Sequence, residues 1–183
     1  MIEEKHEEAV RAAFRLVAGV SSESEKIASQ ILAHGQRLEG VKKNRSAREA
    51  QVFEEVMRES ASDIIAYANG LEDAIRGFET NIPLITEGFS TRIAEIDTET
   101  PEGKEELATY IRELRGLAQT FADGKGKIAV MHGHFTVMRD KDYDPRLTQS
   151  AIVALRTIDR LFAAYEEFET FALSVLHAAG ERS

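Results

Sequence analysis

The sequence predicts an all-α protein: an elongated antiparallel helical bundle with long, heptad-patterned helices. Apolar side chains recur at three- and four-residue spacing through most of the chain, the period of a helix that buries one face. Only three prolines occur in 183 residues, and two of them directly follow residues that cap helices. No segment has the pattern of a β-strand. We therefore expect residues 1–183 to form a single helical-bundle domain.

The N-terminal region predicts two helices, at about 3–18 and 22–44. Glutamates crowd the start of the first helix, where the helix dipole stabilises negative charge. Gly19 suits the position just after a helix. Ser22 and Glu25 then have the spacing of a capping box, in which each side chain satisfies a backbone N–H at the start of a helix. A break between these helices is expected around residues 19–21.

A third helix is predicted over 46–97. The apolar pattern lapses between Lys42 and Arg45, so a break or kink is expected there. Ser46 and Glu49 form a second capping-box pattern. After it, two rows of apolar residues repeat every seven residues, which is typical of a coiled-coil seam. The seam comprises Ile64, Ala68, Leu71, Ile75, Phe78, Ile82, Ile85, Phe89 and Ile96.

Pro83 interrupts this seam. Proline lacks a backbone N–H and its ring clashes with the preceding helical turn. The seam keeps its phase on both sides, so we expect a kink near Pro83 within one continuous helix. The alternative is two helices joined by a sharp turn near Thr80 to Pro83.

Three more helices are predicted, at about 101–122, 126–139 and 145–179. Pro101 and Pro145 suit the first helical position, and each follows a residue that caps helices well. Two glycines separate the first two of these helices and predict a break at 123–125.

The charge is acidic, with 32 Asp and Glu against 23 Lys and Arg and a formal net charge of −9. Negative charge repels phosphate backbones, so we expect no nucleic-acid partner.

Cysteine is absent, which excludes disulfides and thiolate metal sites and fits a reducing cytoplasm. The start of the chain lacks the pattern of a signal peptide. The longest strongly apolar stretch, Thr170 to Gly180, is too short for a membrane span, which needs about 20 residues. We expect a cytoplasmic protein.

The sequence carries no complete motif for catalysis or for metal binding. The sequence has no nucleophile elbow, phosphate-binding loop or dinucleotide fingerprint, so no enzyme, catalytic residue or cofactor is predicted. Glu3 and His6 form the only Glu-x-x-His pair, fewer than a di-iron bundle needs. His132 and His134 point to opposite sides of a helix. The loop from Asp140 to Asp144 lacks the glycine and glutamate of a calcium loop. No metal site is predicted.

One short stretch of the sequence is rich in lysine and arginine and contains a single acidic residue. It either binds an anionic partner or lipid headgroup, or it is a solvated helix junction that pairs with acidic neighbours. This basic cluster comprises Arg37, Lys42, Lys43, Arg45 and Arg48.

A group of aromatic residues marks the last predicted helix. Most of them share one helical face and fit the core of a bundle; an apolar pocket or a subunit interface is the alternative. This aromatic group comprises Phe162, Tyr165, Phe168 and Phe171.

The leading functional prediction is a non-enzymatic interaction or scaffold protein that self-associates or docks a protein partner along the apolar seam. The prediction depends on a seam that exceeds what the other helices can cover, and on the absence of catalytic motifs. One alternative is a bundle that associates with a lipid or membrane surface without spanning it, such as a subunit of a pore-forming or membrane-remodelling system. Another is a metal- or ligand-binding bundle.

Overall fold

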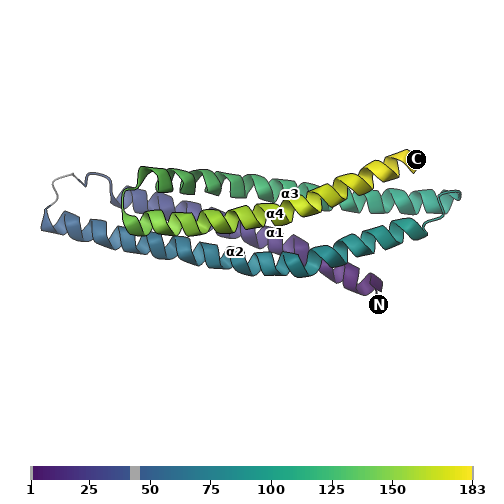
Figure 1. Ribbon diagram of the computed structural model, residues 1–183, viewed down its shortest axis with the longest axis horizontal. Helices are drawn as coiled ribbons and strands as arrows, with labels where there is room; N and C mark the ends of the chain where they lie inside the picture. Colours follow the sequence, from purple (N-terminus) through teal and green to yellow (C-terminus); the bar gives the residue numbers. More distant parts are fainter. Residues whose placement is uncertain (1, 42–45, 183) are drawn as a thin grey trace. The chain divides into compact units, whose positions relative to one another are not determined.

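The computed structural model describes residues 2–41 and 46–182, and within these ranges it is an all-α helical bundle without strands (Figure 1). The predicted fold class is confirmed. Long helices account for nearly all of the described residues. They are α1 (Ile2–Arg37), α2 (Ala47–Glu95), α3 (Pro101–Lys141) and α4 (Pro145–Arg182).

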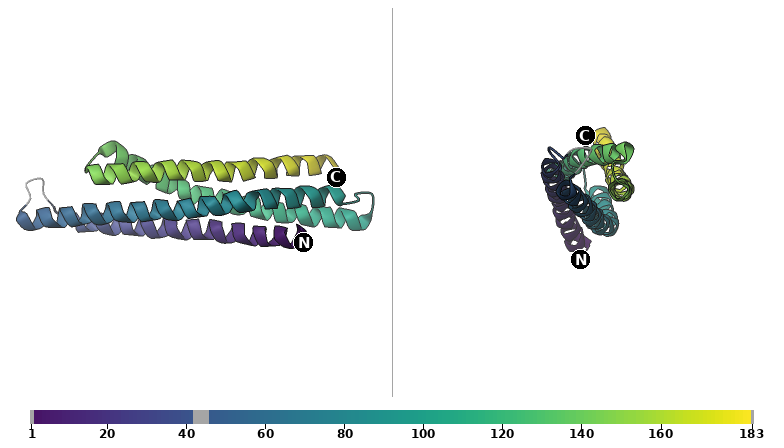
Figure 2. Two further views of the ribbon diagram at one scale, coloured as in Figure 1. Left: turned by 60° about the horizontal axis from the view of Figure 1, so that its bottom comes forward. Right: turned by 90° about the vertical axis from the view of Figure 1, so that its left-hand side faces the viewer.

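The chain divides into two compact units, and each helix contributes one stretch to each unit. Unit 1 comprises Met1–Gly19, Ala74–Gly126 and Leu161–Ser183; unit 2 comprises Val20–Asp73 and Lys127–Arg160. Within each unit, helices that are consecutive in the chain run in opposite directions (Figures 1 and 2). The antiparallel arrangement follows from the short connections between long helices. Whether the whole chain folds as a single domain stays a prediction.

The core of unit 1 is a cluster of aromatic rings from α2, α3 and α4. Phe78 meets Tyr165 edge to face, with ring centroids 5.1 Å apart, and Phe121 meets Phe168 at 4.4 Å. All four side chains are fully buried. Edge-to-face and tilted ring pairs at these separations add to the free energy gained by burying the rings. This cluster fixes three of the helices of unit 1 against one another.

The seam of α2 is core rather than surface. Ile64, Leu71 and Phe78 are each at most 1% exposed, and the companion row from Ala68 to Phe89 is at most 4% exposed. Only Ile96, beyond the end of α2, is half-buried. The heptad pattern therefore predicted the buried face of α2 correctly. The premise that the other helices cannot cover the seam is wrong.

Pro83 lies inside α2, which is one helix from Ala47 to Glu95. The alternative of two helices with a turn near Thr80 to Pro83 is wrong, and the continuous helix is confirmed. Proline inside a helix costs about 3 kcal/mol. The buried seam on both sides of Pro83 outweighs that cost, because ending the helix would expose Ile82 and Ile85. The kink itself stays a prediction.

The predicted break at 19–21 is wrong, because α1 runs without interruption from Ile2 to Arg37. Val17 and Val20 are both 3% exposed, so the buried face continues through Gly19. Ser22 does not begin a new helix, because it lies inside α1. Two residues later, Ser24 Oγ donates to the Val20 carbonyl at 2.8 Å and shares a hydrogen bond with the Tyr67 hydroxyl at 2.8 Å. Tertiary packing here overrides the weak helix propensity of glycine.

The break predicted at 123–125 is also wrong, and α3 is one helix rather than two. Phe121 and Ile128 are both 0% exposed and lie two helical turns apart on the same face. Gly124 permits a close approach, because a Cβ at this position would lie 2.8 Å from Cγ1 of Val17. The glycine is therefore a contact point between α1 and α3, not a helix end.

After each interhelical connection the next helix begins where the capping residues predicted, whereas the end of α1 was predicted too late in the chain. α1 ends at Arg37 rather than at 44, and Gly40 has a left-handed φ of 80°. The expected break at Lys42 to Arg45 lies outside the described residues. The capping box at Ser46 is confirmed: its N–H donates to Glu49 at 2.7 Å, and its Oγ accepts from the Glu49 N–H at 3.3 Å.

The starts of α3 and α4 are both as predicted. Thr100 Oγ1 accepts from the Gly103 N–H at 3.0 Å, and Asp144 Oδ1 accepts from the Arg146 N–H at 2.9 Å. These caps satisfy backbone donors that the first helical turn leaves open.

Replacing neighbouring glycines tests the continuity of α3. Gly126→Ala should stabilise the protein by up to about 1 kcal/mol, because a Cβ there meets nothing within 4 Å and alanine favours the helix. Gly124→Ala should instead destabilise it, because the buried, β-branched Val17 cannot easily move away. Urea unfolding of both variants measures the difference. Equal effects would contradict the close approach of α1 at Gly124.

The cap of α4 should make stability depend on pH. Hydrogen bonds from Arg146 hold the pKa of Asp144 below its ordinary value of 3.8. A lowered folded-state pKa contributes stability that is present at neutral pH and lost as pH falls through that value. Asp144→Asn keeps the capping group but removes the charge. The variant should be less stable than the parent at pH about 7 and approach it at pH about 3, measured by urea unfolding at each pH.

Candidate functional site

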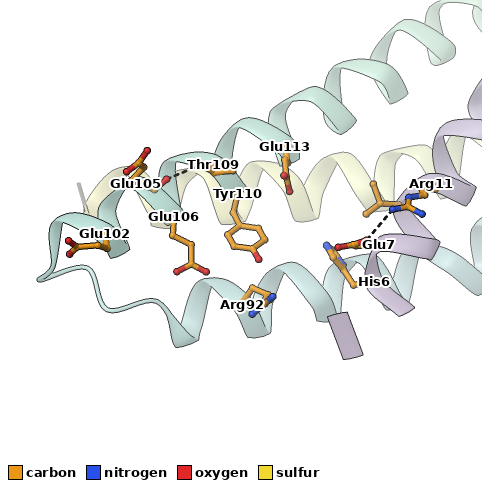
Figure 3. Close-up of a pocket in the computed structure, with 11 residues that line it drawn as sticks. His6, Glu7, Arg11, Arg92, Glu102, Glu105, Glu106, Thr109, Tyr110 and Glu113 are labelled. Carbon is orange, nitrogen blue, oxygen red and sulfur yellow. Dashed lines mark hydrogen bonds and ion pairs between the residues drawn. The ribbon is translucent and has the colours of Figure 1, made fainter. Parts of the chain in front are cut away.

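An open cavity of about 740 Å³ lies in unit 1 between the start of α1, the last turns of α2 and the start of α3 (Figure 3). Its charged lining residues are mainly acidic, and we call it the acidic cleft. It is lined by His6, Glu7, Val10, Arg11, Arg92, Glu102, Glu105, Glu106, Thr109, Tyr110 and Glu113.

The acidic cleft carries five carboxylates and two guanidinium groups, a net charge of −3 when His6 is neutral. One carboxylate is already paired, since Arg11 Nη2 lies 3.1 Å from Glu7 Oε2. The guanidinium carbon of Arg92 lies 5.9 Å from the centroid of the Tyr110 ring. The four carboxylates on α3 are exposed, and in the described part of the chain they form no ion pair. They are Glu102, Glu105, Glu106 and Glu113.

The acidic face of α3 follows from its local sequence. Glu102, Glu106 and Glu113 are separated by about one and two helical turns, so they lie along one side of the helix. Gly103 and Leu107 lie on an adjacent face, about 100° farther around the helix, and are buried. A Cβ at Gly103 would overlap the carbonyl oxygen of Asp97, so only glycine lets the connection pack this closely on α3. Burial of one face therefore directs the carboxylates outward.

The rings of His6 and Tyr110, which line the acidic cleft, pack on a buried ring of α2 beneath it. The centroid of the Phe89 ring, on α2, lies 4.7 Å from the centroid of the His6 ring and 6.4 Å from that of the Tyr110 ring. The plane of the Phe89 ring is nearly perpendicular to both. Phe89 is only 1% exposed and belongs to the seam. Figure 3 shows His6 from α1 and Tyr110 from α3 extending toward the space between the helices, with Arg92 beside Tyr110. The cleft thus combines a carboxylate rim with an aromatic base.

His6 is the most unusual residue of the cleft. It is 8% exposed, and its Nδ1 is buried without a hydrogen-bond partner. The ring lies directly on α2 at Gly88, where a Cβ would overlap Nδ1. Sequence reasoning noted His6 only as half of a rejected metal pair. No local signal connects it to Gly88, because the two positions meet only through helix packing.

The structure places the basic cluster only in part. Arg37 is at the end of α1, where it pairs with Glu59 and lies 3.8 Å from Glu55. The hydrogen bond from Arg37 lowers the pKa of Glu59. Arg48 is exposed in the first turn of α2. Lys42, Lys43 and Arg45 lie outside the described residues. Arg37 thus pairs with acidic neighbours, and binding of an anionic partner stays a prediction.

The aromatic group of the last helix is mainly core. Tyr165 and Phe168 are fully buried in unit 1, as their shared helical face predicted. Phe162 and Phe171 are half-buried. An interface at this position could involve only these two residues, and it stays a prediction.

The rejected metal candidates have other contacts. His132 Nε2 lies 3.4 Å from Asp159, and His134 is exposed. Asp142 accepts a hydrogen bond from Thr148 at 2.7 Å, and Asp144 caps α4. Within residues 2–41 and 46–182, no group of three or more acidic and histidine residues is arranged to hold a metal ion.

The chain matches no known family model, no curated protein and no solved structure. Among the described residues, no helix combines the length and apolar character required to cross a bilayer.

A double-mutant cycle tests the contact between His6 and Gly88. Gly88→Ala should lower the free energy of unfolding, because the added methyl group overlaps the imidazole. His6→Ala in the same chain should remove most of that penalty, since residues in contact have non-additive effects. Gly116→Ala is the matched control on α3, because its Cβ meets nothing within 4 Å and should not destabilise. Additive effects in urea unfolding would show that the two residues do not touch.

Proposed function

We propose that this protein is a non-enzymatic interaction protein that docks a basic segment of a partner protein in the acidic cleft. The observation that carries the proposal is the row of exposed α3 carboxylates, without ion pairs in the described part of the chain, beside the rings of His6 and Tyr110. The carboxylates supply acceptors for lysine and arginine side chains. Tyr110 and Val10 supply apolar surface for their methylene groups.

Electrostatic focusing supports a cationic occupant. A concave surface lined by one sign of charge concentrates its field and raises the local concentration of oppositely charged partners. The overall charge of −9 adds a long-range attraction of the same sign. Each exposed ion pair contributes only about 0.2–1 kcal/mol, so several must act together. A segment with several basic residues meets that requirement better than a single cation.

The docking surface differs from the one that the sequence predicted. Phe78 and its neighbours along the seam are buried within the chain, so the seam offers no free apolar stripe for self-association. The acidic cleft also repels the anionic headgroups on which a lipid-binding function would depend. A cytoplasmic location is part of the proposal and is supported by the absence of cysteine.

Charge removal in the cleft tests this function. An end-blocked, fluorescent lysine- and arginine-rich peptide should bind the full chain, and affinity should fall as salt is added. A triple glutamine variant should weaken binding by about tenfold, because three favourable ion pairs are lost. Fluorescence anisotropy gives both affinities. The variant carries Glu102→Gln, Glu105→Gln and Glu106→Gln.

The matched control removes the same total charge from exposed positions outside the cleft. It should bind the peptide almost as well as the parent, since only long-range attraction is reduced. No binding by the parent, or equal losses in the two variants, would refute docking in the cleft. The control carries Glu39→Gln, Glu79→Gln and Glu167→Gln.

A further inference from the structure

The imidazole of His6 presents a hydrogen-bond donor to the acidic cleft. Its Nδ1 is buried, has no partner and faces Gly88, where the glycine Cα offers only C–H groups. A C–H group can lie against a nitrogen lone pair, but it cannot accept a hydrogen bond. In a neutral imidazole one nitrogen carries the hydrogen and the other carries the lone pair. The surroundings of Nδ1 therefore favour the tautomer in which Nε2 carries the hydrogen.

The Nε2–H of His6 is then the donor that the ring offers to an occupant of the cleft, because Nδ1 is the buried nitrogen. His6 is more than nine-tenths buried, and its ring extends into the space that Tyr110 and Glu7 border (Figure 3). No hydrogen bond in the described part of the chain involves this ring. Nδ1 is the atom of this ring that is buried without a partner, whereas Nε2 is not fully buried, so water can accept from Nε2 before an occupant binds. An occupant that displaces this water must carry an acceptor at the same point, or the donor loses its hydrogen bond.

Cationic groups cannot supply this acceptor. Lysine ammonium and arginine guanidinium groups have only donors, and protonated amines of a polyamine are the same in this respect. A polypeptide carries a carbonyl at every residue. We infer that the acidic cleft recognises its basic ligand as a polypeptide, with cationic side chains on the α3 carboxylates and a main-chain carbonyl on His6 Nε2. This inference rests on the proposed function, because it names the chemistry of the segment that docks there.

The spacing of the carboxylates fits an extended segment. Glu102 and Glu113 are separated along α3 by about 16 Å, at 1.5 Å per residue. An extended chain covers that distance with about five residues, and its alternate side chains lie about 6.6 Å apart. Glu102 and Glu106 are separated by about 6 Å of helix. Lysine or arginine at alternate positions of the segment therefore matches the acidic face.

Two substitutions at His6 distinguish the effect of a donor at Nε2, which faces the cleft, from that of a donor at Nδ1, which faces Gly88. The amide nitrogen of His6→Gln takes the approximate place of Nε2, whereas that of His6→Asn takes the approximate place of Nδ1. Both variants put a smaller polar group against Gly88, so a purely structural effect should be similar in both. Thermal unfolding followed by circular dichroism measures that effect.

The probes are an end-blocked peptide with lysine at alternate positions and a linear polyamine of equal charge, titrated calorimetrically into the full chain. His6→Asn should bind the peptide about fivefold more weakly than the parent, and His6→Gln should remain within about twofold, since one hydrogen bond contributes about 1 kcal/mol. Neither substitution should change the affinity for the polyamine.

The possible negative results distinguish an error in this inference from an error in the proposed function. If the parent binds the peptide but the two substitutions have equal effects, His6 does not recognise a carbonyl and this inference is overturned while docking stands. The same follows if polyamine affinity falls in parallel with peptide affinity. If the parent does not bind the peptide at all, the proposed function fails and this inference fails with it.

Discussion

The buried face of α2 is the constraint on which both units depend. Its apolar residues repeat every seven positions and are covered by the other helices over nearly the whole length of α2. In unit 1, Phe78 packs against rings from α3 and α4, and in unit 2 Tyr67 lies 5.8 Å from Phe135. Because burial of this face supplies so much of the hydrophobic free energy, α2 tolerates Pro83 in its interior.

The same buried face also positions the candidate site. Phe89 is part of the seam, and its ring lies beneath those of His6 and Tyr110. Gly88, next to it, leaves the space that the imidazole occupies. The polar chemistry of the cleft therefore depends on the apolar packing beneath it. A change in the register of α2 by one residue would move Phe89 away from the His6 and Tyr110 rings and put a larger side chain than glycine against His6.

Glycines in this chain have two different roles, and sequence reasoning could not separate them. Gly124 and Gly88 lie at close approaches between helices, where a larger residue would meet a neighbouring side chain. Gly19 and Gly126 have open space around the Cβ position and still lie inside helices. The two predicted helix breaks were wrong because they were based on the low average helix propensity of glycine. The role of each glycine here depends on which helix packs against it.

The sequence by itself determined the fold class, the buried face of α2 and the helix starts at Ser46, Thr100 and Asp144. These features depend on residues close together in the chain: apolar spacing within one helix, and capping groups within three positions of the N–H they satisfy. Only the tertiary structure decided where helices continue through glycine, and which distant residues form the acidic cleft. His6 and Gly88 carry no pattern that links them, because contacts between helices depend on how whole faces pack.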